Sequence, residues 1–175
     1  MASFNIIFRD NAFIVADQSI ANVLFHENGY GLLDSSGVLK LHPVEVLFLV
    51  DLGKAKVVDE RGNTIAFKEL CDLCERMDRF VWVKFLVYSD LRRRGYIVRV
   101  DLGEEPIFYV YRRGAKPSEE ASRYVVYVLR EGVRVSFTKI EQLVRWCQDL
   151  KKELILAIVD RQGEVVYYSL SSVIL

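Results

Sequence analysis

The chain has 175 residues, of which 51% are hydrophobic and 27% charged, so it can bury one sizeable core or two small ones. With 24 basic and 24 acidic residues, its net charge does not indicate nucleic-acid binding. Charged residues interrupt every apolar run well short of the roughly 18 residues that a membrane-spanning helix needs, and no signal peptide is evident. We expect a cytoplasmic protein with no membrane partner.

The first 78 residues alternate short strand-like runs with helical ones. The expected strands are 4–9, 12–16, 38–41 and 55–58, and the expected helices are 19–26, 43–50 and 67–77. Turn signals such as Asn28-Gly29 and Arg61-Gly62-Asn63 separate them. This alternation predicts a small N-terminal α+β domain over residues 1–78.

The remaining residues, 79–175, begin with an expected helix over 80–94. Gly95 should end this helix, because its missing Cβ suits a left-handed C-cap. Beyond it the hydrophobic period changes to two, which predicts a further helix and five strands: helix 139–150 and strands 96–100, 107–111, 124–129, 154–159 and 165–169. The apolar run from Ile155 to Val159 is typical of a strand covered on both faces. A helix-packed mixed sheet is therefore predicted.

The chain contains three cysteines. Cys71 and Cys74 have the spacing of zinc and redox sites, but a four-ligand zinc site needs a second pair, which the sequence lacks. We expect Cys71 and Cys74 to be buried free thiols, with Cys74 on the inner face of its helix, and Cys147 likewise to lie on the inner face of a helix. The sequence thus predicts no metal and no cofactor.

Several segments carry a nuclease-like pattern. They are YSDLRRRGY at 88–96, FYVYRRG at 108–114, ASRYVV at 121–126, KKELILAIVD at 151–160 and GEVVYY at 163–168. These segments closely resemble the archaeal tRNA-splicing endonuclease family, and LHPVEVLFLVDLGK at 41–54 is similar to a helix of its N-terminal domain. The resemblance implies a restriction-endonuclease-like α/β fold for residues 79–175. It also implies metal-free RNA cleavage that leaves a 2′,3′-cyclic phosphate and a 5′-hydroxyl.

The resemblance places the family's catalytic tyrosine, histidine and lysine at Tyr111, Ala121 and Lys152. Histidine suits proton transfer because its unperturbed pKa is about 6.5, and a lysine ammonium supplies fixed positive charge. An alanine methyl transfers no proton, and losing positioned proton transfer costs roughly 100- to 10,000-fold in rate. We therefore expect the chain alone to be nearly inert, with Tyr111 and Lys152 vestigial.

No other residue is an evident replacement for the histidine. His26 closes an apolar run and His42 precedes Pro43 at an expected helix start, so both have ordinary structural explanations. Glu119 and Glu120 precede position 121, but a solvated carboxylate with a pKa near 4.3 is a poor proton donor at pH 7.

Three functions remain open at this point. The favoured one is a non-catalytic, structural subunit of a heterotetrameric tRNA-splicing endonuclease. Such an enzyme excises introns from precursor tRNA at bulge-helix-bulge sites, and here a partner subunit would supply the histidine. The second is a weakly active endonuclease using Tyr111 and Lys152. The third is a domain repurposed for RNA binding or protein interaction.

Basic residues gather between positions 90 and 135, which suggests local phosphate contact despite the neutral net charge. They are Arg92, Arg93, Arg94, Arg112, Arg113, Lys116, Arg123, Arg130 and Arg134. Arg112 and Arg113 are the RNA-binding candidates among them, and a solvated face is the alternative. Arg145 occupies a position where the family carries an arginine that can stack against a bulged base, or it is an ordinary surface residue.

The resemblance also implies subunit contacts. In the family an acidic loop between the last two strands enters a basic groove of another subunit, which points to Asp160 and Glu164 here. The C-terminal strand pairs across a dimer interface, which points to Val173 and Leu175. A plain hairpin turn and a frayed terminus are the alternatives.

Overall fold

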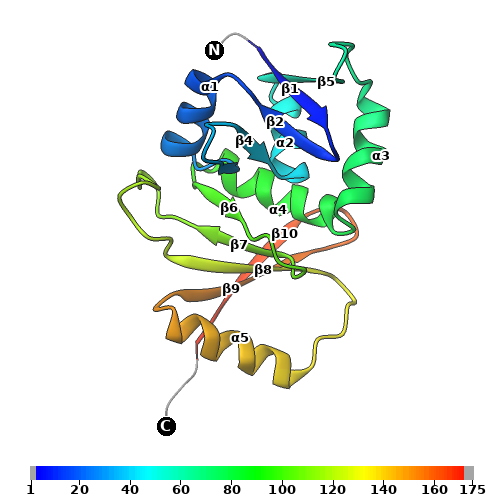
Figure 1. Cartoon of the computed structure of the whole chain (residues 1–175). Coiled ribbons are helices and arrows are strands. Elements are labelled where there is room, and N and C mark those ends of the chain that lie inside the picture. Colours follow the sequence, from blue (N-terminus) through cyan, green and yellow to red (C-terminus); the bar gives the residue numbers. More distant parts are fainter. Residues whose placement is uncertain (1–2, 172–175) are drawn as a thin grey trace.

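The computed structural model describes residues 3–171, which form two five-stranded sheets with helices around them (Figure 1). The strands of the first sheet are β1 (Phe4–Arg9), β2 (Ala12–Val15), β3 (Leu32–Leu33), β4 (Leu39–Leu41) and β5 (Ala55–Val58). Their order is β3-β4-β2-β1-β5, with β1 and β5 parallel and the other neighbours antiparallel. The helices of this half are α1 (Gln18–Asn22), the π-helix η1 (Val23–Glu27), α2 (Pro43–Asp51) and α3 (Phe67–Met77).

The second half begins with α4 (Val81–Arg93) and builds the second sheet. Its other elements are β6 (Val98–Val100), β7 (Ile107–Val110), β8 (Tyr124–Arg130), α5 (Phe137–Asp149), β9 (Glu153–Val159) and β10 (Val165–Leu170). The strand order is β10-β9-β8-β7-β6, with β8 and β9 parallel and the rest antiparallel. Parallel neighbours need a crossover connection, which α5 supplies. The α+β class and the two-part arrangement are confirmed.

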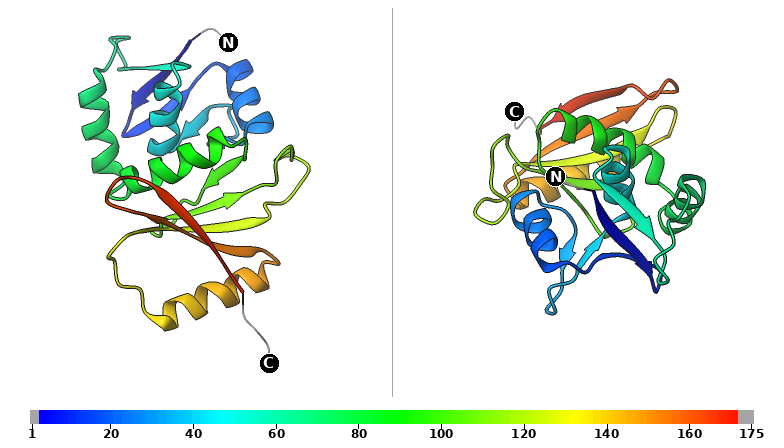
Figure 2. Two further views of the ribbon diagram at one scale, coloured as in Figure 1. Left: turned by 180° about the vertical axis from the view of Figure 1, so that it is seen from behind. Right: turned by 90° about the horizontal axis from the view of Figure 1, so that it is seen from above.

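Helix α4 lies between the two sheets, as Figure 2 shows from behind. The buried ring of Tyr88 packs edge-on against Phe48 of α2, at 5.5 Å between centroids, and against Phe108 of β7, at 5.8 Å. One continuous core therefore contains side chains from both sheets. On the opposite face of the second sheet, α5 covers a smaller cluster of Ile107, Val125, Tyr127, Leu143, Cys147 and Leu154.

The end of α4 explains why β6 is shorter than expected. Gly95 adopts the left-handed conformation with φ of 86°, as predicted. Its N–H donates to the Arg92 carbonyl, and the Tyr96 N–H donates to the Leu91 carbonyl at 3.1 Å, which is the Schellman pattern. Because Tyr96 closes the helix, the strand starts only at Val98.

The helix expected over residues 19–26 is interrupted. After α1 the chain continues as the π-helix η1, because the backbone N–H and the side-chain amide of Asn28 both donate to the Val23 carbonyl, at 3.3 and 3.0 Å. This spacing widens the final turn by one residue.

None of the helices within residues 3–171 is both long and apolar enough to span a membrane.

Arg92 ties the two halves together. Its guanidinium carbon lies 4.1 Å from the ring centre of Tyr30 and 5.1 Å from that of Tyr88. It donates to the Asn28 carbonyl at 2.7 Å, to the Val98 carbonyl at 3.0 Å and to the Tyr88 hydroxyl. The sequence grouped Arg92 with phosphate-binding candidates, and the structure corrects this, because four hydrogen bonds and two aromatic rings hold the guanidinium within the protein.

Candidate functional site

The strand register brings positions 111, 121 and 152 to one edge of the second sheet. Tyr111 follows the end of β7, and Ala121 precedes β8 by three residues. Since β7 and β8 are antiparallel, the end of one lies beside the start of the other, with Val110 opposite Tyr124. Strand β9 is parallel to β8 and places its first residue opposite Tyr124, so Lys152 joins the same edge.

Lys152 is anchored beside position 121. Its ammonium donates to the carbonyl and the hydroxyl oxygen of Ser122, at 2.6 and 2.7 Å. The turn from α5 into β9 sets this position, because Lys151 adopts a positive φ of 55° and the Lys152 N–H donates to the Cys147 carbonyl. The lysine is thus held by the residue that follows the family's histidine position. Sequence reasoning assigned no role to Ser122, although this residue belongs to the ASRYVV segment at 121–126 that carries the resemblance.

Tyr111 is 8% exposed. Its backbone N–H donates to the Ile97 carbonyl at 2.9 Å, which extends the pairing of β6 with β7 by one step. Within residues 3–171 its hydroxyl has no hydrogen-bond partner. The side chain is therefore positioned by its backbone and by packing.

Position 121 opens toward solvent. A shallow cavity of about 390 Å³ is lined by Arg112, Glu120, Ala121, Ser122, Arg123 and Lys151. Tyr111 and Lys152 do not line this cavity. The carboxylate of Glu153 pairs with Arg123, whereas Arg112 has no ion-pair partner among the described residues. The edge therefore offers cations for a phosphate, but the Ala121 methyl offers no proton.

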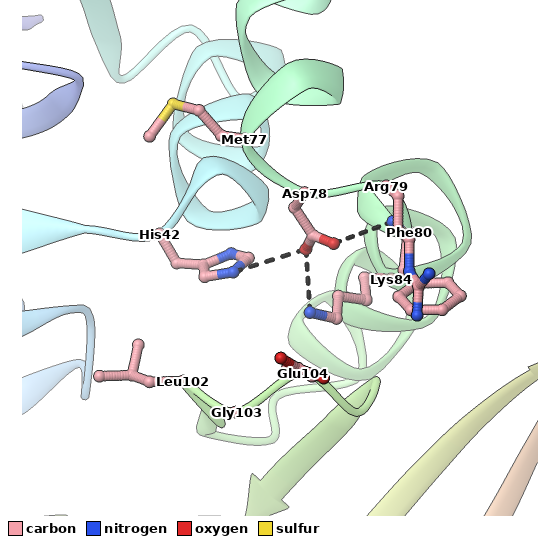
Figure 3. A pocket seen from close by; sticks show the side chains of 9 residues that line it. All are labelled: His42, Met77, Asp78, Arg79, Phe80, Lys84, Leu102, Gly103 and Glu104. Carbon is pink, nitrogen blue, oxygen red and sulfur yellow. Dashed lines mark hydrogen bonds and ion pairs between the residues drawn. The ribbon is translucent and has the colours of Figure 1, made fainter.

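The histidines lie elsewhere. His42 caps α2, where its Nδ1 accepts from the Val44 N–H at 3.2 Å, and its Nε2 lies 3.5 Å from Asp78 (Figure 3). It lines a cavity of about 470 Å³ together with Lys84, which is 3% exposed and donates to Asp78 at 2.9 Å. His26 belongs to η1 and packs edge-on against Phe25. His42 therefore has a structural role, and His26 is exposed on η1.

The two glutamates before position 121 are bound to a neighbouring lysine. Glu119 accepts from the Lys116 ammonium at 3.3 Å, and Glu120 accepts from the Lys116 backbone N–H at 3.2 Å. Both side chains are exposed at the surface of the loop.

Because His42 is enclosed, the folded protein should lose stability in mild acid. Burial, reinforced by Lys84 and opposed by Asp78, lowers the pKa of His42 from 6.5 to about 4. The neutral form stabilises the fold above pH 6.5, and this stability is lost as the pH falls from 6.5 to 4, on the order of 2–3 kcal/mol. Urea unfolding across this range measures it. His42→Asn keeps a capping oxygen without titrating, and should show a shallower loss. If the free energy of unfolding falls equally with pH in the native protein and in His42→Asn, the prediction is contradicted.

The three cysteines are free thiols that differ in burial. Burial raises the pKa of Cys74 to about 12 and that of Cys147 to about 11. Cys71 is only half-buried, which corrects the prediction, because it lies one position around α3 from the inward-facing Leu70 and Cys74. No cluster of histidine, cysteine, aspartate and glutamate within residues 3–171 is arranged to hold a metal ion.

The basic residues of the second half separate into two groups. Arg93, Arg94 and Arg123 pair with Asp51, Asp90 and Glu153, respectively. Arg112, Arg113, Arg130 and Arg134 are exposed and have no ion pair within the described part of the chain. Arg145 is likewise exposed, on α5. These are the arginines free to contact phosphates or bases.

The loop between β9 and β10 is a tight turn built by Asp160. Its Oδ1 accepts from the N–H groups of Gln162 and Glu164, both at 2.9 Å, while the Glu164 side chain is exposed. Asp160 therefore shapes the loop as well as charging it. Val173 and Leu175 lie outside the described residues.

The fold defines a two-part α+β protein. Residues 6–71 match the tRNA intron endonuclease N-terminal domain, and residues 81–167 match the tRNA intron endonuclease catalytic C-terminal domain. The chain therefore belongs to the tRNA intron endonuclease family, which confirms the resemblance seen in the sequence.

The chain is also similar to named relatives over nearly its whole length. It is 37% identical to a tRNA-splicing endonuclease from Thermococcus onnurineus over 161 residues, 92% of this chain and 91% of that protein. It is 35% identical to one from Pyrococcus abyssi with the same coverage. One from Methanococcus maripaludis is 38% identical over 145 residues, 83% of this chain and 81% of that protein.

Proposed function

We propose that this chain is the non-catalytic, structural subunit of a heterotetrameric tRNA-splicing endonuclease. Its partner is a catalytic subunit that retains the histidine. The complex excises introns from precursor tRNA at bulge-helix-bulge sites. Within the chain, residues 1–78 form the N-terminal domain and residues 79–175 the endonuclease-like domain.

The observation that carries this proposal is the alanine at position 121. The surrounding framework is intact, because Lys152 is anchored at Ser122 and the register of β7, β8 and β9 is regular. The missing group is the one that transfers protons near pH 7. His42 does not substitute, because it caps α2 and is bound near Asp78.

The experiment that tests the proposal is cleavage of a precursor tRNA by the chain alone and by the chain mixed with a histidine-bearing subunit. Activity in the mixture only is the expected result. Cleavage by the chain alone would favour the weakly active endonuclease that uses Tyr111 and Lys152.

Assembly is proposed to use the loop of Asp160 and Glu164, whose carboxylates would enter a basic groove of the partner. The double variant Asp160→Asn/Glu164→Lys should weaken tetramer association on the order of tenfold and increase its salt sensitivity. Asparagine keeps the acceptor that forms the turn, so the loss reports charge. Light scattering during size-exclusion chromatography at two salt concentrations measures it. Arg161→Gln is the matched control, and equal elution of all three proteins would count against the loop.

Arg145 is proposed to stack on a bulged base of the RNA, with Arg112 and Arg113 contacting phosphates. Arg145→Ala should weaken binding of a bulged RNA roughly five- to 100-fold and affect a fully paired RNA of equal length less. Fluorescence anisotropy with both RNAs measures this. Arg134→Ala removes another exposed arginine and should lower both affinities alike. The same pattern for Arg145→Ala would make Arg145 an ordinary surface cation.

A further inference from the structure

A pocket rich in tyrosine lies where α4 ends and the second sheet continues. It encloses about 310 Å³ and is lined by Leu91, Arg94, Tyr96, Val110, Tyr124, Val126, Ile155 and Tyr167. Val110, Val126 and Ile155 come from the three adjacent strands β7, β8 and β9 and form an apolar floor. We call this the tyrosine pocket. This pocket is not explained by the nuclease-like edge, which is the edge of the second sheet that carries positions 111, 121 and 152.

The aromatic walls of the pocket differ in how they are held. The Tyr167 hydroxyl donates to Asp90 at 2.6 Å. Burial, and to a smaller extent this hydrogen bond, raises the pKa of Tyr167. Tyr96 and Tyr124 are half-buried, and neither hydroxyl has a hydrogen-bond partner within residues 3–171. The pocket therefore combines one fixed ring with two rings whose hydroxyls remain available to a ligand.

The rim of the pocket is cationic. The guanidinium of Arg113 lies 4.8 Å from the ring centre of Tyr96 and has no ion pair among the described residues. Arg94 lies 5.6 Å from the ring centre of Tyr167 and pairs with Asp90 at 3.0 Å. Asp90 is thus already neutralised by Arg94 and bound to Tyr167. Arg113 therefore leaves an unpaired positive charge beside the Tyr96 wall, and Arg112, the preceding residue, lines the separate cavity next to Ala121.

We propose that the tyrosine pocket binds one unpaired nucleobase of an RNA, whose flanking phosphates meet Arg113 and Arg112. The volume lies at the lower end of the roughly 300–1,000 Å³ of ligand pockets and suits a single heterocycle. Stacking on aromatic rings is tolerant of base identity, and recognition of unpaired RNA bases uses such rings together with polar groups at the base edge. The two available hydroxyls supply those polar groups.

The position of the pocket connects it with the nuclease-like edge. Val110 and Tyr124 line the pocket, and the residues next to them in the chain, Tyr111 and Arg123, belong to that edge. One RNA strand can therefore reach both. The inference rests on the proposed function in one respect, namely that RNA lies along this end of the second sheet.

The test uses the full chain and three RNA hairpins of one sequence. One is fully paired, one has a single unpaired 2-aminopurine, and one has an abasic residue at that position. The variant is Tyr96→Leu/Tyr124→Leu, which keeps the pocket apolar. The matched control is Tyr168→Leu, because successive side chains of a strand point to opposite faces and Tyr168 is exposed on the face away from Tyr167.

The native chain should quench the 2-aminopurine and bind that hairpin roughly five- to 100-fold more tightly than the abasic one. The double variant should lose both the quenching and the preference while still melting in one cooperative transition, and Tyr168→Leu should retain both. Absence of a preference in the native chain, or its persistence in the folded double variant, would overturn the inference. A further outcome would also overturn it. If the native chain shows no base preference and the double variant changes its oligomeric state, the pocket holds a protein side chain instead of a base.

The experiments distinguish a failure of the pocket inference from a failure of the proposed function. If the native chain supports cleavage with a catalytic subunit but shows no base preference, the pocket inference is wrong and the proposed function stands. If the preference is present but no partner is activated, the pocket inference stands and the structural-subunit proposal is wrong.

Discussion

The chain alone is expected to leave a precursor tRNA with a bulge-helix-bulge site uncut, and to support cleavage once a histidine-bearing subunit is added. The rate difference should be roughly 100- to 10,000-fold, the typical contribution of a positioned proton-transfer group. Ala121 has no proton to transfer, while the Lys152 ammonium remains anchored at Ser122. Single-turnover cleavage with and without the partner, in the presence of a metal chelator, measures the difference.

The control for this experiment changes the partner. Substituting the partner's catalytic histidine by alanine should abolish cleavage by the mixture, because neither subunit then carries the proton-transfer group. Persistent cleavage by that mixture, or chelator-resistant cleavage by the chain alone at a comparable rate, would overturn the structural-subunit proposal. It would instead assign activity to the site of Tyr111 and Lys152.

Replacing Arg92 should cause a large loss of stability. Arg92→Met keeps an unbranched chain but leaves the carbonyls of Asn28 and Val98 without their donor, and it removes a charge close to the buried Glu45. Leaving these groups without the charge and its hydrogen bonds costs about 3–5 kcal/mol. The free energy of unfolding from urea denaturation measures the loss.

The neighbouring arginine is the matched control. Arg93 is of the same type on the same helix, but its side chain is 62% exposed and pairs with Asp51 at the surface. Arg93→Met should therefore cost about 0–1 kcal/mol. Equal losses for the two variants would contradict the assignment of Arg92 as the connection between the halves.

The run of three arginines at 92–94 shows a limit of prediction from sequence. Composition and position group them as one basic cluster, yet Arg92 is enclosed, Arg93 pairs across to α2 and Arg94 pairs within α4. Successive residues of a helix are rotated by about 100°, so neighbours in sequence face different surroundings. Which face meets the first half of the chain depends on how α4 docks, and that is a tertiary property.

The sequence by itself determined the types of most elements, the cap at Gly95, the family and the alanine at position 121. These follow from periodicity, local backbone preference and motif spacing, all of which act over a few residues. Only the tertiary structure decided the anchoring of Lys152 by Ser122, 30 residues away, the link from Arg92 to Asn28, 64 residues away, and the assembly of the tyrosine pocket from separate strands. Such contacts depend on strand register and helix docking, which are selected by burial of the whole core rather than by any local segment.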